Sequence, residues 1–162
     1  MKKGFTLIEA LVYVIIFFLL ITVIIAFVFW FVHSSAKAKA VRETLNTAQW
    51  AMHVMSQEIR ESEGVYTPTS NSTQLSLETS RFLPEGEENS FVDFYLCNDR
   101  LCMKRESQGP VYLTPENIEV NSLSFGYTET SVYIEIGINY RNPSNRSELD
   151  SSIDLRLTTS LR

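Results

Sequence analysis

Residues 10–32 form an unbroken apolar stretch that predicts a membrane-spanning helix. None of these 23 residues carries a formal charge, and Val, Ile, Leu and Phe would occupy every face of the helix. At 1.5 Å per residue the stretch makes about 35 Å of helix, which is enough to cross a bilayer. It is longer than the apolar region of an ordinary secretory signal, and no small-residue cleavage motif follows it.

After residue 33 the pattern becomes that of an amphipathic helix. Apolar side chains recur at intervals of three and four residues, at Val41, Leu45, Ala48, Met52, Met55 and Ile59. No Pro or Gly interrupts residues 5–63, so we expect one helix of roughly 90 Å that ends at Gly64. Three heptads are short for a coiled coil, and we therefore expect this apolar seam to pack on a sheet of the same chain.

Residues 64–162 predict a β-rich head. Apolar and polar residues alternate at 75–77, 132–140 and 153–157, as in strands with one buried face. The apolar parity switches between 118–120 and 123–127, which predicts a bulge near Asn121 and Ser122. The expected fold is α+β: one long N-terminal helix packed on an antiparallel β-sheet head.

The charge and composition of the head bear on which partners and activities it can have. From Val65 to Arg162 there are 14 acidic and 8 basic residues, a balance that disfavours nucleic acid as a partner. No catalytic constellation is apparent, and both histidines, His33 and His53, lie on the predicted helix. We therefore expect no enzyme activity, no cofactor and no metal site.

Cys97 and Cys102 flank a predicted hairpin turn. Across such a turn the two residues would lie directly opposite each other, at a separation compatible with a disulfide. Two free thiols are the alternative. A zinc site lacks two of its four ligands, and the spacing differs from that of a redox C-x-x-C motif.

Glu9 stands directly before the apolar stretch and is the only formal charge between Phe5 and Ala36. A carboxylate that reaches the middle of a bilayer costs about 2.5–3.5 kcal/mol. Glu9 would therefore either reach the lipid headgroups or meet a positive charge from a neighbouring chain. Basic residues lie on both sides of the stretch, so charge alone does not orient it.

The segment Lys-Lys-Gly-Phe-Thr-Leu-Ile-Glu at 2–9, followed by the apolar stretch, resembles the processing site of type IV prepilins and type II secretion pseudopilins. The resemblance implies that a prepilin peptidase cleaves between Gly4 and Phe5 and that the new Phe5 amine is N-methylated. Residues 1–4 would be a cytoplasmic leader peptide. Residues 5–32 would form the transmembrane, filament-core half of the helix and 33–63 its amphipathic half. The Phe5 ammonium would form an assembly salt bridge with Glu9 of a neighbouring subunit.

Four further segments, 56–60, 92–105, 118–127 and 159–162, resemble J-type minor pseudopilins and related minor pilins. The resemblance implies a minor pilin-like subunit that assembles into a type II secretion pseudopilus or a type IV pilus, in priming or at the tip. Its partners would be other pilins or pseudopilins, the prepilin peptidase, the inner-membrane assembly platform and membrane lipid. The chain would span the cytoplasmic (inner) membrane once, with an exported head that is periplasmic or extracellular.

Two alternatives stay open at this point. A competence-type pilin would serve DNA uptake, although the acidic head gives that reading no support. A plain single-pass anchor for an exported domain would keep its first four residues, whereas a processed pilin would begin at N-methylated Phe5.

Overall fold

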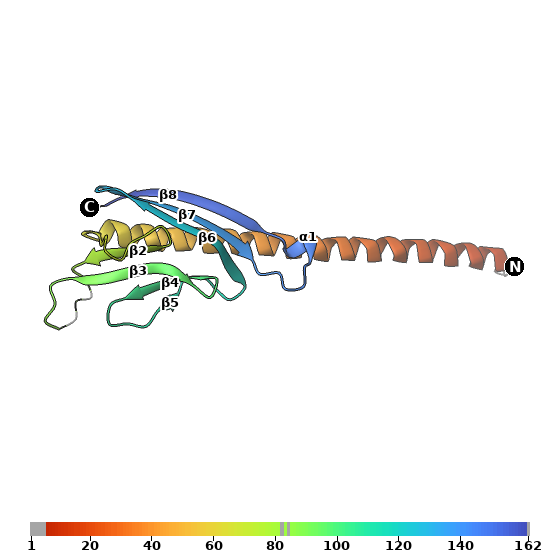
Figure 1. Ribbon diagram of the computed structural model, residues 1–162. Helices are drawn as coiled ribbons and strands as arrows, with labels where there is room; N and C mark the ends of the chain where they lie inside the picture. Colours follow the sequence, from red (N-terminus) through yellow and green to blue (C-terminus); the bar gives the residue numbers. More distant parts are fainter. Residues whose placement is uncertain (1–5, 82, 84, 162) are drawn as a thin grey trace.

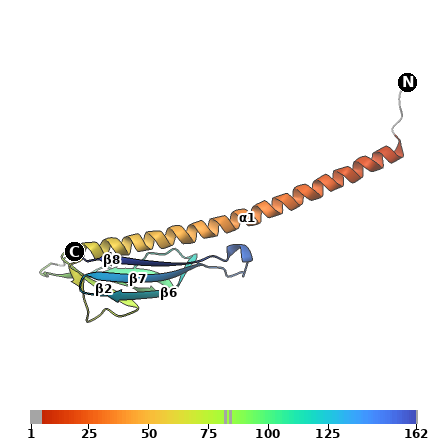
Figure 2. The same cartoon turned by 90° about the horizontal axis from the view of Figure 1, so that it is seen from above.

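The computed structural model describes residues 6–81, 83 and 85–161. Its helix α1 (Leu7–Glu61) runs without a break from the apolar stretch into the head (Figure 1). At 1.5 Å per residue the 55 residues of α1 extend about 80 Å. The first half of α1 projects away from the rest of the chain, and the second half lies along the head (Figure 2).

The head contains two antiparallel sheets. Its elements are β1 (Gly64–Val65), β2 (Gln74–Thr79), β3 (Ser90–Cys97), β4 (Arg100–Arg105), β5 (Val111–Tyr112), β6 (Ile118–Tyr127), β7 (Ser131–Tyr140), the 3₁₀ helix η1 (Ser147–Leu149) and β8 (Ser152–Ser160). One sheet has the order β1-β2-β3-β4-β5 and the other the order β6-β7-β8. Both sheets lie on the same side of α1, which packs mainly on β8, β7 and η1 (Figure 2). This arrangement confirms the predicted α+β fold.

One hydrophobic core joins the helix to both sheets. Strand β7 contributes most regularly, because its alternate residues Val132, Ile134, Ile136 and Ile138 are fully buried. Phe94 on β3 and Met55 on α1 are the largest of the other fully buried side chains. Strands with one buried face therefore produce the period-two pattern seen in the sequence.

The predicted bulge is confirmed. The pairing of β6 with β7 shifts register between Val120 and Ser122. The extra residue moves the inward-facing positions from Ile118 and Val120 to Leu123 and Phe125, all four of which are buried. A bulge thus explains how one strand can present both parities to the same core.

The buried face of α1 differs from the predicted seam. Val41 and Leu45 were expected in the core, yet they are 39% and 36% exposed. The buried residues of α1 are Ala40, Thr44, Ala48, Ala51, Met52, Met55, Ser56 and Ile59. Residues four apart lie about 40° from one another around a helix, so rows with this spacing wind slowly across its surface. The head packs along these rows. Where the head begins, the small side chains of α1 let the strands approach the helix closely.

The end of α1 also differs from the prediction. Ser62, not Gly64, caps the helix: its backbone is extended, and its hydroxyl donates to the Ile59 carbonyl at 2.7 Å. Gly64 already belongs to β1 and is not among the described glycines with positive φ. The chain therefore leaves the helix through a serine hydrogen bond instead of a left-handed glycine.

The close approach of α1 to the head predicts that Ala48→Leu lowers the free energy of unfolding by about 1–3 kcal/mol, because Ala48 has no exposed surface and no room for three more carbons. Chemical denaturation of the full chain in detergent, followed by a tertiary signal of the head, measures this loss. Ala38→Leu makes the same change at an exposed position of α1 and should leave the value nearly unchanged. Equal values for the two variants would show that α1 does not pack as described.

Candidate assembly interface

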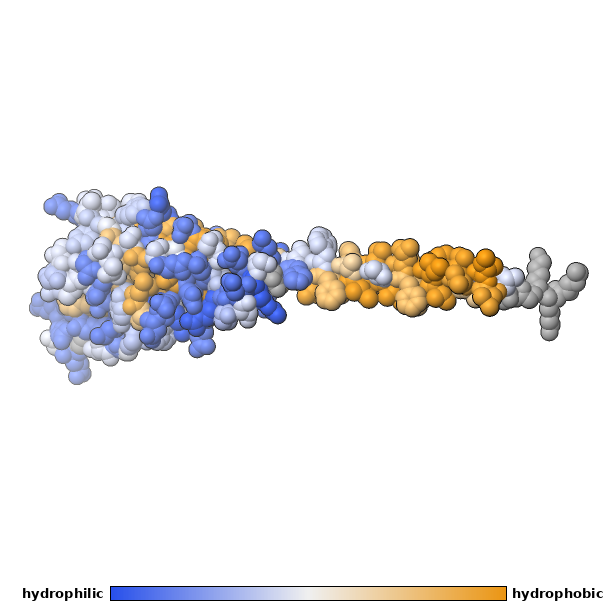
Figure 3. Space-filling view, turned by 45° about the vertical axis from the view of Figure 1, so that its right-hand side comes forward, coloured by the Kyte–Doolittle hydropathy of each residue, from blue (hydrophilic) through white to orange (hydrophobic). Residues whose placement is uncertain are grey.

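The first half of α1 is an apolar surface that nothing in the described chain covers. From Leu7 to Val32 its large apolar side chains are 47% to 85% exposed, except Ile21, which is partly buried. They form a continuous hydrophobic surface that ends where the head begins (Figure 3). By length and composition this helix can cross a membrane, and its most apolar segment has no buried residue. An apolar rod of this kind requires lipid or other apolar helices around it.

Two hydroxyl groups in and just after this half bond to the backbone of the same helix. The Thr22 hydroxyl donates to the Phe18 carbonyl at 2.9 Å, and the Ser35 hydroxyl donates to the Val32 carbonyl at 2.9 Å. Beyond its first turn the backbone amides of the segment are paired within the helix. These bonds lower the cost of placing the segment in lipid.

Glu9 lies in the first turn of α1. Thr6 is the N-cap: its carbonyl accepts from the Glu9 amide at 3.0 Å, and its hydroxyl accepts from the same amide at 3.4 Å. A carboxylate in the first turn interacts favourably with the helix dipole. The Glu9 side chain is exposed, so a neighbouring chain can reach it. The predicted cleavage site at Gly4 and Phe5, and the N-methylation of Phe5, lie outside the described residues.

Three carboxylates on the second half of α1 bind the head. Arg105 of β4 pairs with Glu58 at 2.6 Å, with 27% and 12% of the two side chains exposed. Near the start of the head, the Asn117 amide donates to Glu43 at 2.5 Å. Near its end, Glu61 pairs with Arg81. Sequence reasoning missed these contacts because the partners of Glu58 and Glu43 are 47 and 74 residues away.

The hairpin β3–β4 carries the predicted disulfide between Cys97 and Cys102, with a Cα–Cα distance of 6.0 Å. The expected direct pairing of the two cysteines is wrong: Cys97 is opposite Arg100, and Cys102 is opposite Tyr95. The turn has only two residues, Asn98 and Asp99, both with positive φ. Direct pairing of the two cysteines would require a turn of four residues, 98–101. The disulfide therefore runs diagonally across one face of the hairpin.

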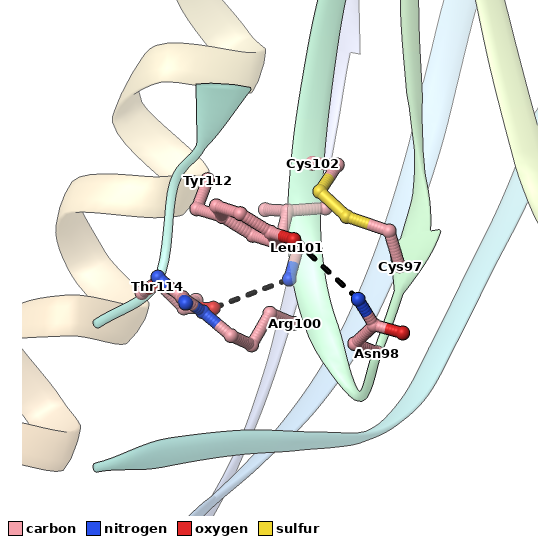
Figure 4. Close-up of a disulfide and its surroundings, with 7 residues drawn as sticks. All are labelled: Cys97, Asn98, Arg100, Leu101, Cys102, Tyr112 and Thr114. Carbon is pink, nitrogen blue, oxygen red and sulfur yellow. Dashed lines mark hydrogen bonds between the residues drawn. A yellow bond between two sulfur atoms is a disulfide. The ribbon is translucent and has the colours of Figure 1, made fainter. Parts of the chain in front are cut away.

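Side chains around the disulfide connect this hairpin to the next segments. The Arg100 guanidinium lies 3.9 Å from the centre of the Tyr112 ring and donates to the Thr114 carbonyl at 2.8 Å (Figure 4). The Leu101 amide donates to the Thr114 hydroxyl at 3.2 Å. On the other side, the Asp99 carbonyl accepts from an amide of β6 at 2.8 Å. The hairpin turn thus helps to join the two sheets.

No group of three or more His, Cys, Asp or Glu that could hold a metal ion occurs within residues 6–81, 83 and 85–161. Comparison of the chain with protein-family models, with curated proteins and with solved structures gives no match.

Removing the disulfide should lower the stability of the head without removing its fold. The closed ring is short, since the cysteines are five residues apart. Loss of this cross-link therefore predicts a decrease of about 2 kcal/mol in the free energy of unfolding for the C97S/C102S variant. Denaturation of the oxidised chain and of the variant measures the difference. A count of two free thiols in the mature wild-type protein would contradict the disulfide itself.

Proposed function

We propose that this chain is a minor pilin-like subunit, a pseudopilin, that a prepilin peptidase processes between Gly4 and Phe5. The mature subunit assembles into a type II secretion pseudopilus or a type IV pilus. Its apolar half-helix first crosses the membrane and then packs in the filament core, while the head stays outside. Its work is non-covalent: it holds neighbouring subunits in place.

The position of Glu9 is the observation that carries this proposal. Glu9 is the one formal charge between Thr6 and Ala36, and it sits in the first turn of an otherwise uncovered apolar helix. A lipid anchor has no need of a carboxylate at this place, and the carboxylate lowers its affinity for lipid. A subunit that binds the terminus of its neighbour does need one.

Cleavage would supply the matching charge. A free amine at Phe5 has an ordinary pKa of about 7.7–8.0, so at neutral pH most of it is an ammonium. N-methylation keeps that charge and adds apolar surface. If neighbouring helices pack with an axial stagger, the Phe5 ammonium of one meets the Glu9 carboxylate of the next, and neither charge stays unpaired among apolar side chains.

The placement of this subunit in priming or at the tip follows from its resemblance to J-type minor pseudopilins. An exported location of the head is consistent with its disulfide, because disulfides form and persist in oxidising compartments. The partners in this proposal are the other pilins or pseudopilins of the filament, the peptidase, the inner-membrane assembly platform and lipid.

Processing is the first testable consequence. The chain purified from membranes of cells that contain a prepilin peptidase should begin at N-methylated Phe5, as read by mass spectrometry of its N-terminal peptide. A Gly4→Leu variant should keep its first four residues, because a bulky side chain then occupies the residue before the cleaved bond. Ala38→Leu introduces the same bulky side chain at an exposed position far from that bond; it is the matched control and should be processed. A wild-type chain that retains Met1 in such cells would support the plain membrane anchor instead.

The second consequence concerns assembly. Glu9→Ala should lower recovery of the subunit with sheared filaments by at least about tenfold, because it leaves the neighbouring ammonium without its partner in an apolar setting. Glu63→Ala removes an exposed carboxylate just after α1 and should leave recovery unchanged. Both variants should unfold like the wild type. Recovery of the Glu9→Ala chain at the wild-type level would count against the assembly role.

A further inference from the structure

The carboxylates and the cations on the second half of α1 differ in whether they have partners. Its carboxylates at Glu43, Glu58 and Glu61 all contact the head. Among its cations, Lys39, Arg42 and Arg60 are exposed. None of these three cations makes an ion pair or hydrogen bond with another residue that the structure describes. The exposed surface of this half therefore carries cations without a partner among the described residues.

These cations belong to an ordered row along the helix. Lys39, Asn46, His53 and Arg60 follow one another at intervals of seven residues, which is nearly two turns or about 10 Å per step. Arg42 and Gln49 lie beside them. We call this set of six residues the basic row; all six are exposed, and none is acidic. The row offers hydrogen-bond donors over roughly 30 Å.

The head has the opposite charge, and its cations are largely in use. Arginines 81, 105, 141 and 156 each pair with a glutamate of this chain. The exposed Arg141 has a pKa above its ordinary value because Glu119 accepts its hydrogen bond, so this arginine stays charged and paired with Glu119. Acidic side chains such as Glu87 and Glu88, in the segment between β2 and β3, are exposed. The free charge on the surface of the head is thus mainly negative.

We propose that the basic row of one copy binds the acidic head of a second copy of this chain. The inference rests on the proposed function in one respect: packed half-helices hold two copies side by side during priming, which a single subunit at the tip would not allow. Exposed ion pairs are individually weak, but membrane confinement gives the two surfaces a high effective concentration, and several pairs then act together. A row set against an acidic surface also fixes the axial stagger between the copies.

Lipid headgroups are the other anionic surface near the start of the row. They do not account for its far end, because Arg60 lies 18 residues beyond Arg42, about 27 Å further along the helix. That distance exceeds the screening length of about 8 Å at physiological salt. The acidic head of a second copy can reach the whole row.

The test uses two differently tagged full-length copies, expressed together in cells that contain the peptidase and the assembly platform, and co-purified in mild detergent. The variant R42E/R60E should lower co-purification by about tenfold, since two attractions become repulsions. The control K104E/R146E makes the same change of charge at two exposed residues of the head; because it adds acid to the surface that the row would bind, it should not lower co-purification. Pairing an R42E/R60E copy with an E87K/E88K copy should restore most of the lost co-purification.

Three results would overturn the proposal. The first is that R42E/R60E matches its control, and the second is that E87K/E88K in the second copy fails to restore binding. The third is that Arg42→Glu alone accounts for the whole loss while Arg60→Glu has no effect. The last result would assign the row to lipid headgroups. All variants should show the wild-type N-terminal peptide and the wild-type unfolding transition, so that a defect in processing or folding is recognised.

The same experiment separates this proposal from the proposed function. If Glu9→Ala weakens co-purification and R42E/R60E does not, the subunit assembles but the basic row is not its interface. If the wild type neither loses its first four residues nor co-purifies with itself, the pilin-like function fails as well.

Discussion

The apolar surface from Leu7 to Val32 is the constraint on which the rest of the molecule depends. Fully burying one large apolar side chain contributes about 1.5–3 kcal/mol, and this half-helix exposes more than twenty of them. No part of the described head folds back over it, so its stable environments are lipid and other helices of the same kind. The polar contacts of the fold lie elsewhere, on the head and on the second half of α1. Glu9 alone brings a formal charge into the apolar part.

Much of the fold could be predicted from the sequence because its elements have strong local periodicity. Strand β7 and the first part of β8, residues 153–157, alternate apolar and polar residues, and the switch of parity within β6 marks its bulge. The unbroken run without Pro or Gly gave the helix. The Cys97–Cys102 pairing was also accessible, since only four residues, among them turn-forming Asn and Asp, separate the two cysteines.

The face of α1 that packs on the head could not be predicted in the same way. Periodicity places Val41 and Leu45 on the seam because they are more hydrophobic than Ala40 and Thr44. The structure favours the smaller pair, since burial there is decided by how closely the head approaches the helix. Long-range pairs such as Glu58 with Arg105 have no local signal at all. Single-sequence patterns report which residues are apolar, whereas the choice of face depends on tertiary geometry.

The charges on the second half of α1 and on the head form a complementary pair. The carboxylates of this half are taken up by contacts with the head: Glu58 pairs with Arg105 and is only 12% exposed as a side chain, and Glu61 pairs with Arg81. These contacts use arginines of the head, and this leaves the head with an excess of acid. The exposed cations Lys39, Arg42 and Arg60 have no partner among the described residues. One set of internal contacts thus leaves cations on the helix and acid on the head, and in the proposed assembly these charges meet between copies.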